Sequence, residues 1–248
     1  MRDFIVKTNV AYGVNTARAN LLDLMRPESS ATLPVAIHFH GGGWKMFGKH
    51  LPETEFLAQA GFCVVSANYR YAQEAVFPAQ FEDAKAVVRF IRANAAELKI
   101  DPNRIFAWGI SAGAHIAALL GSDVSSGLRA VACICPPTDL SNPTDWKLEY
   151  TDTAFAFLLG ARADQHPKIA KAASPVFQVS SQSAPTLIIH GAKDTLVPLP
   201  QAEALQNVLE NAGVPNRLVV IPEGNHFINE THMPKIRQEI LDFFRRGY

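Results

Sequence analysis

The sequence has no net charge and no long hydrophobic run. Its 248 residues include 23 Lys and Arg against 23 Asp and Glu, so no overall field attracts nucleic acid or an anionic membrane. Its charge-free apolar stretches are far shorter than the roughly 20 residues of a membrane-spanning helix. The first residues, MRDFIVKTNVAYG, lack the apolar region of a secretory signal peptide. We therefore expect a cytoplasmic protein with no nucleic-acid partner and no membrane span.

Cysteine is also scarce. The count of three is odd, and Cys133 and Cys135 alternate within one apolar run, which predicts buried thiols on the same side of a strand. Two cysteines without a second cluster nearby make a poor metal site. The sequence also lacks G-x-G-x-x-G and a Gly-Lys-Ser/Thr ending, the usual signs of a phosphate-binding loop. We therefore expect no structural disulfide, no metal and no cofactor.

What the chain does contain is a regular alternation of apolar runs of strand length with runs of helical period. With 48% apolar and 19% charged residues, it is expected to form one globular domain over residues 1–248. Nearly continuous apolar runs such as CVVSA and TLIIH are typical of a parallel sheet covered on both faces. The alternation predicts a doubly wound α/β sheet, to which the segment up to about Pro34 adds antiparallel edge strands.

One region interrupts this alternation. The stretch from Thr138 to about Ser183 is rich in Pro, Asp, Thr and Ser and has only short apolar clusters. Such excursions between strands of an α/β fold often lie over the active site. We expect a partly helical, cap-like excursion here.

Ser111 stands where a predicted strand meets a predicted helix, in the stretch FAWGISAGAHIAALLG. Gly109 and Gly113 complete the pattern Gly-x-Ser-x-Gly, the nucleophile elbow, in which a Cβ at either glycine would collide with a neighbouring element. The turn exposes the serine hydroxyl, and the helix that follows points its positive end at the reaction site. Chance also produces this short pattern, but its place between strand and helix favours a nucleophile.

A serine hydroxyl needs a base that is held in place by a third group, and on this kind of sheet the chain order is serine, acid, histidine. His226 lies in VVIPEGNHFI, at the C-terminal end of a strand, and is the predicted base. Asp194 follows the preceding strand in HGAKDTLVP and is the predicted acid, because adjacent strands place the two residues side by side. Asp139, after another strand, is the alternative acid. The other downstream histidines are interpreted as structural or surface residues: His115, His166, His190 and His232.

Three glycines follow another predicted strand in HFHGGGW. Glycine lets the backbone approach a substrate oxygen, and preorganised amides stabilise the oxyanion of a tetrahedral intermediate. The predicted donors are the amides of Gly42, Gly43 and Ala112, and His40 is expected to brace the loop. A flexible turn is the plainer alternative.

Several stretches, in a fixed order, resemble α/β-hydrolase-fold serine esterases from about Pro34 onward: HGGGW, SANYRYAQEAVFPAQFEDAKAVVRFIR, GISAGAHIAALLG, ASPV, PTLIIHGAKDTLVP and EGNHFI. The chain looks most like hormone-sensitive-lipase-like carboxylesterases and small bacterial feruloyl-esterase-like (BD-FAE-like) enzymes. The resemblance implies an eight-stranded, mostly parallel sheet with Ser111, Asp194 and His226 as the catalytic triad. It also implies that Arg70 and Asp83 form a scaffold salt bridge.

Two departures favour the smaller branch. The hormone-sensitive-lipase-like signature is usually Gly-Asp-Ser-Ala-Gly-Gly, whereas this chain has Ile110 and Ala114 in place of the Asp and the final Gly. That branch also has a sizeable N-terminal cap, and His40 comes too early to leave room for one. We therefore expect the excursion to be the only cover over the site.

These features predict a serine carboxylesterase that hydrolyses soluble short-chain or aryl carboxylic esters through an acyl-enzyme. Trp44 and Val197 are candidate substrate-binding residues. The alternative for Trp44 is that its side chain simply packs in the protein interior. An arylformamidase-like amide hydrolase would use the same machinery. A tyrosine directly before Trp44 would favour that activity, but this chain has a third glycine there, which favours the esterase. A non-catalytic ligand-binding protein is disfavoured because His226 is present. The oligomeric state stays open, with a homodimer among the options.

Overall fold

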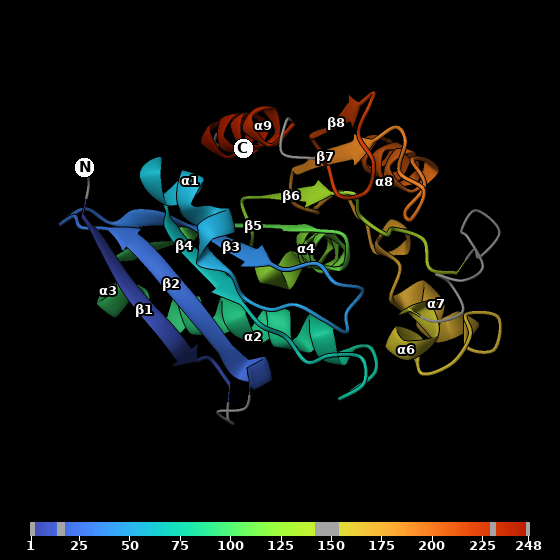
Figure 1. Cartoon of the computed structure of the whole chain (residues 1–248), viewed down its shortest axis with the longest axis horizontal. Helices are drawn as coiled ribbons and strands as arrows, with labels where there is room; N and C mark the ends of the chain where they lie inside the picture. Colours follow the sequence, from blue (N-terminus) through green and yellow to red (C-terminus); the bar gives the residue numbers. More distant parts are fainter. Residues whose placement is uncertain (1–2, 14–17, 142–153, 229–231, 247–248) are drawn as a thin grey trace.

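The computed structural model describes residues 3–13, 18–141, 154–228 and 232–246, which build one eight-stranded sheet with helices on both faces (Figure 1). The strands are β1 (Phe4–Ala11), β2 (Leu21–Pro27), β3 (Leu33–Phe39), β4 (Cys63–Ala67), β5 (Ile100–Ile110), β6 (Ala130–Ile134), β7 (Thr186–Gly191) and β8 (Asn216–Ile221). Their order across the sheet is β1-β2-β4-β3-β5-β6-β7-β8. This confirms the predicted fold class.

The sheet is parallel from β4 to β8, whereas β2 runs antiparallel to both of its neighbours, β1 and β4. The N-terminal segment therefore adds the antiparallel edge that its sequence predicts. The central strands β4, β6 and β7 are buried along their whole length, which is why they read as continuous apolar runs. Outer strand β1 is mostly exposed.

Helices cover the two faces unequally. The helices are α1 (Glu55–Gln59), α2 (Ala79–Ala93), α3 (Ala95–Leu98), α4 (Ala112–Ser122), α6 (Ala156–Leu159), α7 (Pro167–Ala172), α8 (Pro200–Asn211) and α9 (Met233–Arg245). The short 3₁₀ turns are η1 (Arg18–Asn20), η2 (Leu51–Thr54), η3 (Val124–Ser126) and η6 (Pro175–Phe177). α1 and α9 pack on one face and α2, α4 and α8 on the other, so the sheet separates two hydrophobic clusters (Figure 1). None of the described helices combines the length and apolarity that crossing a bilayer requires.

Two helices show how the core is shared. In α2 the buried Ala84, Val88 and Ile91 recur every three or four residues, so one stripe faces the sheet. In α4 every residue is buried, because the helix lies between the sheet, α2 and the segment that carries η6. Burying a Leu or Ile side chain contributes about 1.5–3 kcal/mol, so α4, which carries several, is anchored firmly. This helix begins directly after Ser111.

The excursion contains α6, α7 and η6, as its composition predicts, and residues 142–153 lie outside the described part of the chain. Figure 1 shows α6 and α7 at one end of the molecule, beyond the sheet. Its described part packs against the loop after β3: Phe155 lies 5.8 Å from Trp44 between ring centroids.

The three cysteines are free and buried, as predicted. Cys133 belongs to the cluster on the α4 side and Cys135 to the cluster on the α9 side. The prediction that both point to one side is therefore wrong. Cys135 lies just beyond the end of β6 with a φ of 49°, which breaks the alternation of side chains along the strand.

Candidate active site

Ser111 occupies a strained turn between β5 and α4. Its φ is 55° and its ψ is −118°, a conformation that an L-residue keeps only where the surrounding structure enforces it. A Cβ built on Gly113 would lie 1.9 Å from the carbonyl oxygen of Phe39, and one on Gly109 would lie 2.6 Å from that same oxygen. Both glycines of the elbow are therefore required for the close approach of α4 to β3.

Ser111, His226 and Asp194 meet at the carboxyl end of the sheet. The Ser111 Oγ hydroxyl lies 2.9 Å from Nε2 of His226, and Nδ1 of His226 lies 2.7 Å from Oδ2 of Asp194. The carboxylate only accepts, so Nδ1 carries the proton and Nε2 is left to accept from the serine hydroxyl. Three segments separated by up to 115 residues thus form one hydrogen-bonded relay, in the arrangement that the sequence predicts.

The Asp194 carboxylate is held from several sides. Oδ1 accepts the amides of Leu196 at 2.9 Å and Val197 at 2.8 Å. Nε2 of His190 lies 3.4 Å from Oδ2 and 2.8 Å from the Val197 carbonyl oxygen. Burial acts to raise the pKa of Asp194, but hydrogen bonds from His190, His226 and the Val197 amide, with the charge of His226, hold this pKa well below its ordinary value. The residue is therefore ionised at neutral pH.

Cys135, His190 and Asp194 bring one potential metal-ligand atom each within 4.8 Å of one another. The atoms of His190 and Asp194 that face each other already have partners: His190 Nε2 needs its proton for the Val197 carbonyl, and both oxygens of Asp194 accept hydrogen bonds. Burial, followed by the charge of Asp194, raises the pKa of the Cys135 thiol, which keeps it protonated. The donor set fits a buttress for Asp194 better than a metal site.

The glycine loop after β3 lies against the elbow. A Cβ on Gly41 would come within 3.1 Å of the Ile110 carbonyl oxygen and 3.7 Å of the Ser111 Cβ. Gly42 has a φ of 103°, and a Cβ there would lie 2.3 Å from the Met46 carbonyl oxygen, so only glycine fits.

The three predicted oxyanion donors belong to the glycine loop, which lies against the elbow, and to the start of α4. Gly42 and Gly43 line the same cavity as Ser111, and Ala112 begins α4, where a helix leaves its first amides without an intrahelical partner.

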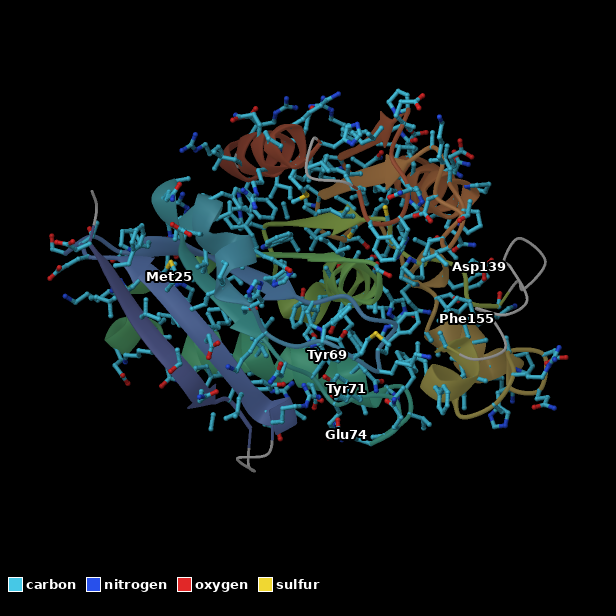
Figure 2. All side chains as sticks on the ribbon, in the orientation of Figure 1. Met25, Tyr69, Tyr71, Glu74, Asp139 and Phe155 are labelled. Atoms are coloured by element: carbon cyan, nitrogen blue, oxygen red, sulfur yellow. The ribbon has the colours of Figure 1, made fainter. Side chains whose placement is uncertain are left out.

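His40 braces the glycine loop as expected. Its Nδ1 lies 2.7 Å from the Gly41 carbonyl oxygen, and its ring stacks on Tyr69 at 4.3 Å between centroids. The Tyr69 hydroxyl donates to the His40 carbonyl oxygen at 2.8 Å. Burial lowers the pKa of His40 to about 4, so the ring is neutral at pH 7. Tyr69 lies on the connection after β4, which continues through Tyr71 (Figure 2). This connection therefore supports the glycine loop through the contacts of Tyr69 with His40.

A cavity of about 710 Å³ opens over Ser111 and His226. Such a volume is within the range of small-molecule sites. Its apolar lining consists of Met46, Phe47, Ile110, Leu196 and Phe227. These residues are not among the substrate contacts predicted from the sequence. Phe47 and Phe227 are 69% and 79% exposed, and their position directly beside the glycine loop and the histidine was the available signal.

Two predicted substrate-binding residues lie elsewhere. Trp44 is completely buried, and its positive φ of 58° turns it into the core against His115 and Phe155. Val197 is also buried, and its backbone supports Asp194. Neither lines the cavity, which corrects the expectation that they contact substrate and leaves the packing alternative for Trp44.

Other assignments agree with the sequence. The alternative acid, Asp139, accepts the Ser141 amide at 2.8 Å and the Ser141 hydroxyl at 2.7 Å, so it stabilises its own turn (Figure 2). Arg70 and Asp83 form the expected salt bridge, at 2.8 Å.

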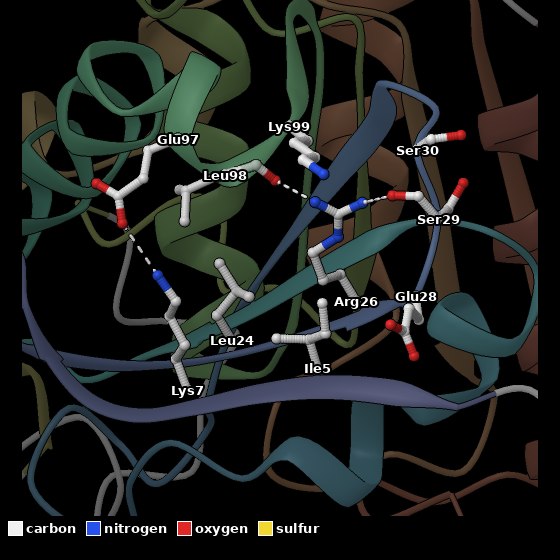
Figure 3. Close-up of a pocket in the computed structure, with 10 residues that line it drawn as sticks. All are labelled: Ile5, Lys7, Leu24, Arg26, Glu28, Ser29, Ser30, Glu97, Leu98 and Lys99. Atoms are coloured by element: carbon white, nitrogen blue, oxygen red, sulfur yellow. Dashed lines mark hydrogen bonds and ion pairs between the residues drawn. The ribbon is translucent and has the colours of Figure 1, made fainter.

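A second cavity, of about 380 Å³, lies between β1, β2, the turn that follows β2 and the end of α3 (Figure 3). Two of its cations are engaged: Lys7 pairs with Glu97 at 3.0 Å, and Arg26 donates to the carbonyl oxygens of Leu98 and Ser29. Parallel sheets bind ligands at their carboxyl ends, so the site is the cavity over Ser111.

The family model BD-FAE matches residues 22–209, about three quarters of the chain. The chain belongs to the BD-FAE family. Among curated proteins, the esterase LipQ of Mycobacterium tuberculosis is 31% identical over 224 residues, which cover 83% of this chain and 53% of LipQ. The chain thus spans about half the length of the curated relatives it matches.

Solved structures extend the comparison over nearly the whole chain. A truncated carbohydrate esterase from gut microbiota has a TM-score of 0.91 and 28% identity, with 98% of this chain and 96% of that chain covered. An acetyl ester-xyloside bifunctional hydrolase from Caldicellulosiruptor lactoaceticus has a TM-score of 0.80 and 27% identity, over 94% and 90% of the two chains. The resemblance to α/β-hydrolase esterases that the sequence motifs indicated is confirmed.

Proposed function

We propose that this chain is a serine carboxylesterase that hydrolyses short-chain or aryl carboxylic esters. The observation that carries the proposal is the relay from Ser111 through His226 to Asp194, with distances of 2.9 and 2.7 Å, beneath a largely apolar cavity. The esterases among the relatives support the same activity. The substrate is a small-molecule ester.

In the first half of the reaction, Ser111 Oγ attacks the ester carbonyl carbon while its proton moves to His226 Nε2. The amides of Gly42, Gly43 and Ala112 stabilise the oxyanion that forms. Collapse of this intermediate breaks the bond to the alcohol, which leaves with the proton from His226. Asp194 keeps the imidazole in the required tautomer and stabilises the imidazolium.

In the second half, water attacks the acyl-Ser111 carbonyl and gives a proton to His226 Nε2. The tetrahedral intermediate again places its oxyanion on the three amides. It then releases the carboxylic acid, and Ser111 Oγ regains the proton from His226. No atom of the enzyme is consumed.

The test is to compare Ser111→Ala with Ser122→Ala, a buried serine at the end of α4. Hydrolysis of p-nitrophenyl acetate and labelling by an organophosphonate are expected to disappear in Ser111→Ala and persist in Ser122→Ala. Circular dichroism checks that both variants fold. Wild-type turnover by Ser111→Ala would refute the proposal.

Substrate choice is tested with a panel read as kcat/KM. The panel includes nitrophenyl esters of increasing acyl length, an aryl acetate, N-formylkynurenine and an acetylated xyloside; the last is included because one structural neighbour is named as an acetyl ester-xyloside hydrolase. The proposal expects the short acyl and aryl esters to react faster than the formamide. A preference for N-formylkynurenine would assign the chain to the arylformamidases instead.

A further inference from the structure

A chain of buried hydrogen bonds connects the glycine loop to the elbow helix and to the excursion. Nε1 of Trp44 donates to Nδ1 of His115 at 3.2 Å, and Nε2 of His115 lies 2.6 Å from the carbonyl oxygen of Ala173. The first two residues are 0% and 1% exposed, and Ala173 follows α7. None of these atoms lines the cavity, so the mechanism above does not use them.

The chemistry of the three groups permits only one arrangement of protons. A carbonyl oxygen only accepts, so His115 Nε2 carries hydrogen; an indole nitrogen only donates, so His115 Nδ1 is bare. A neutral imidazole has this pattern, and burial lowers the pKa of His115 to about 4, which keeps it neutral at pH 7. Both bonds are therefore satisfied together by one tautomer.

Trp44 sits where the loop needs an anchor. It directly follows Gly43, and both residues have left-handed φ values, 58° and 59°. Glycine gives the loop close approach to substrate but also conformational freedom, which would blur the position of its amides. The Trp44 carbonyl oxygen accepts the Ala72 amide at 2.8 Å, so the residue is fixed at its backbone as well as at its ring.

His115 sits one helical turn from the nucleophile. Its amide donates to the Ser111 carbonyl oxygen at 2.9 Å. The backbone of His115 is thus hydrogen-bonded to the elbow, and its side chain is hydrogen-bonded to the glycine loop. The two sources of oxyanion donors, the loop and the start of α4, are tied together by this residue.

We propose that Trp44 and His115 are positioning residues that hold the amides of Gly42 and Gly43 at a fixed distance from Ser111, with Ala173 locking the imidazole. The inference rests on the proposed esterase function. Its consequence is specific: the pair supports the oxyanion, which exists only in the transition state and intermediates, so its loss lowers kcat far more than it raises KM.

The experiment compares Trp44→Phe and His115→Leu with a matched control, Trp108→Phe. Trp108 is a buried tryptophan on β5 whose indole nitrogen has no hydrogen-bond partner among the described residues. The first two variants are expected to lower kcat about 10- to 100-fold with KM within about twofold, because small displacements of oxyanion donors are costly. The control loses a similar ring volume but no hydrogen bond to the glycine loop. Its kcat is therefore expected to stay within about threefold of the wild-type value.

Two further variants separate positioning from packing. The double variant Trp44→Phe with His115→Leu is expected to lose no more than about the larger single effect, since both remove one interaction. His115→Gln keeps an acceptor for Trp44 and a donor for Ala173, and is expected to restore most of kcat. Nuclear magnetic resonance of the Trp44 indole N–H, identified by its loss in Trp44→Phe, is expected to shift in His115→Leu whatever the activity.

The outcomes distinguish this inference from the function on which it rests. A wild-type protein that neither hydrolyses esters nor reacts with an organophosphonate overturns the esterase proposal. An active wild type in which Trp44→Phe behaves like Trp108→Phe, or in which KM rises as much as kcat falls, overturns the positioning role alone. An unchanged Trp44 indole resonance in His115→Leu would show that the wild-type protein has no hydrogen bond between Trp44 and His115.

Discussion

The acid–base half of the site, at the ends of β7 and β8, is held together by side chains, whereas the oxyanion half, at the end of β3 and the start of α4, is shaped by backbone. Asp194 and His226 meet through a 2.7 Å hydrogen bond, and the loss of one functional group would break this arrangement. Gly42 and Gly113 have no side chain to lose, and an added Cβ would lie 2.3 and 1.9 Å from backbone carbonyl oxygens.

This difference indicates how each half fails. The acid–base half is sensitive to the removal of charge or of a donor, whereas the glycines of the oxyanion half are sensitive to the addition of atoms. The first is therefore probed by isosteric substitutions and by pH, and the second by substitutions as small as glycine to alanine.

The largest effect is expected from Asp194→Asn. The amide cannot fix the His226 tautomer or stabilise the imidazolium, and the equivalent change in a serine protease lowers kcat about 10⁴-fold. The matched control is Asp139→Asn, at the alternative acid, where only a local turn is affected. Steady-state kinetics on p-nitrophenyl acetate provide the comparison. A large loss in Asp139→Asn with a small one in Asp194→Asn would reverse the assignment of the acid.

The next effect is expected from Gly42→Ala, compared with Gly61→Ala. The two glycines have similar φ values, 103° and 99°, so backbone strain is matched, but a Cβ on Gly61 meets nothing within 4 Å. Gly42→Ala must displace the loop and is expected to lower kcat about 100-fold, as for loss of an oxyanion donor. Gly61→Ala is expected to lose stability without losing kcat. Equal kcat values for the two variants would show that the loop does not bind the oxyanion.

These two comparisons rest on parts of the molecule that the sequence predicts well. Alternating apolar runs determine a parallel sheet, and parallel strands bring the residues after them to one edge. Ser111, Asp194 and His226 are such residues, so their convergence follows from chain order. The elbow glycines were predictable for the same reason, because close packing between β3 and α4 tolerates no Cβ.

The direction of single side chains in irregular segments was less predictable. Trp44 and Cys135 both have positive φ values, which no periodicity reveals. Trp44 turns into the core, one of its two predicted alternatives, and Cys135 turns away from the expected side. The partner of Trp44, His115, is 71 positions away and on another element. The cavity lining, including Leu196 and Phe227, comes from loops whose course depends on tertiary contacts.

A smaller effect concerns stability and affects only the acid–base half. The folded-state pKa of Asp194 is depressed below its ordinary 3.8, so its ionised form stabilises the fold at pH values above about 3.8, and this contribution is lost as pH falls through the folded-state pKa. The urea midpoint of Asp194→Asn is therefore expected to be below that of the wild type at pH 7 and 5, and the gap is expected to begin to narrow at pH 3. A gap that widens at pH 3 would contradict the depressed pKa.

The smallest effect is expected from His190→Leu, which tests whether the acid–base half extends beyond its three residues. His190 contributes one shared donor, 3.4 Å from Asp194 Oδ2 and 2.8 Å from the Val197 carbonyl oxygen, while Asp194 keeps its two amides and His226. A single hydrogen bond contributes about 0.5–1.5 kcal/mol, which corresponds to a loss of about 2- to 10-fold in kcat. If His190 acts through the carboxylate, the substitution adds no further loss in an Asp194→Asn background, because the charge it supports is already gone. An equal loss of kcat in both backgrounds would instead show that His190 acts through core packing and not through Asp194, so that the relay ends at Asp194.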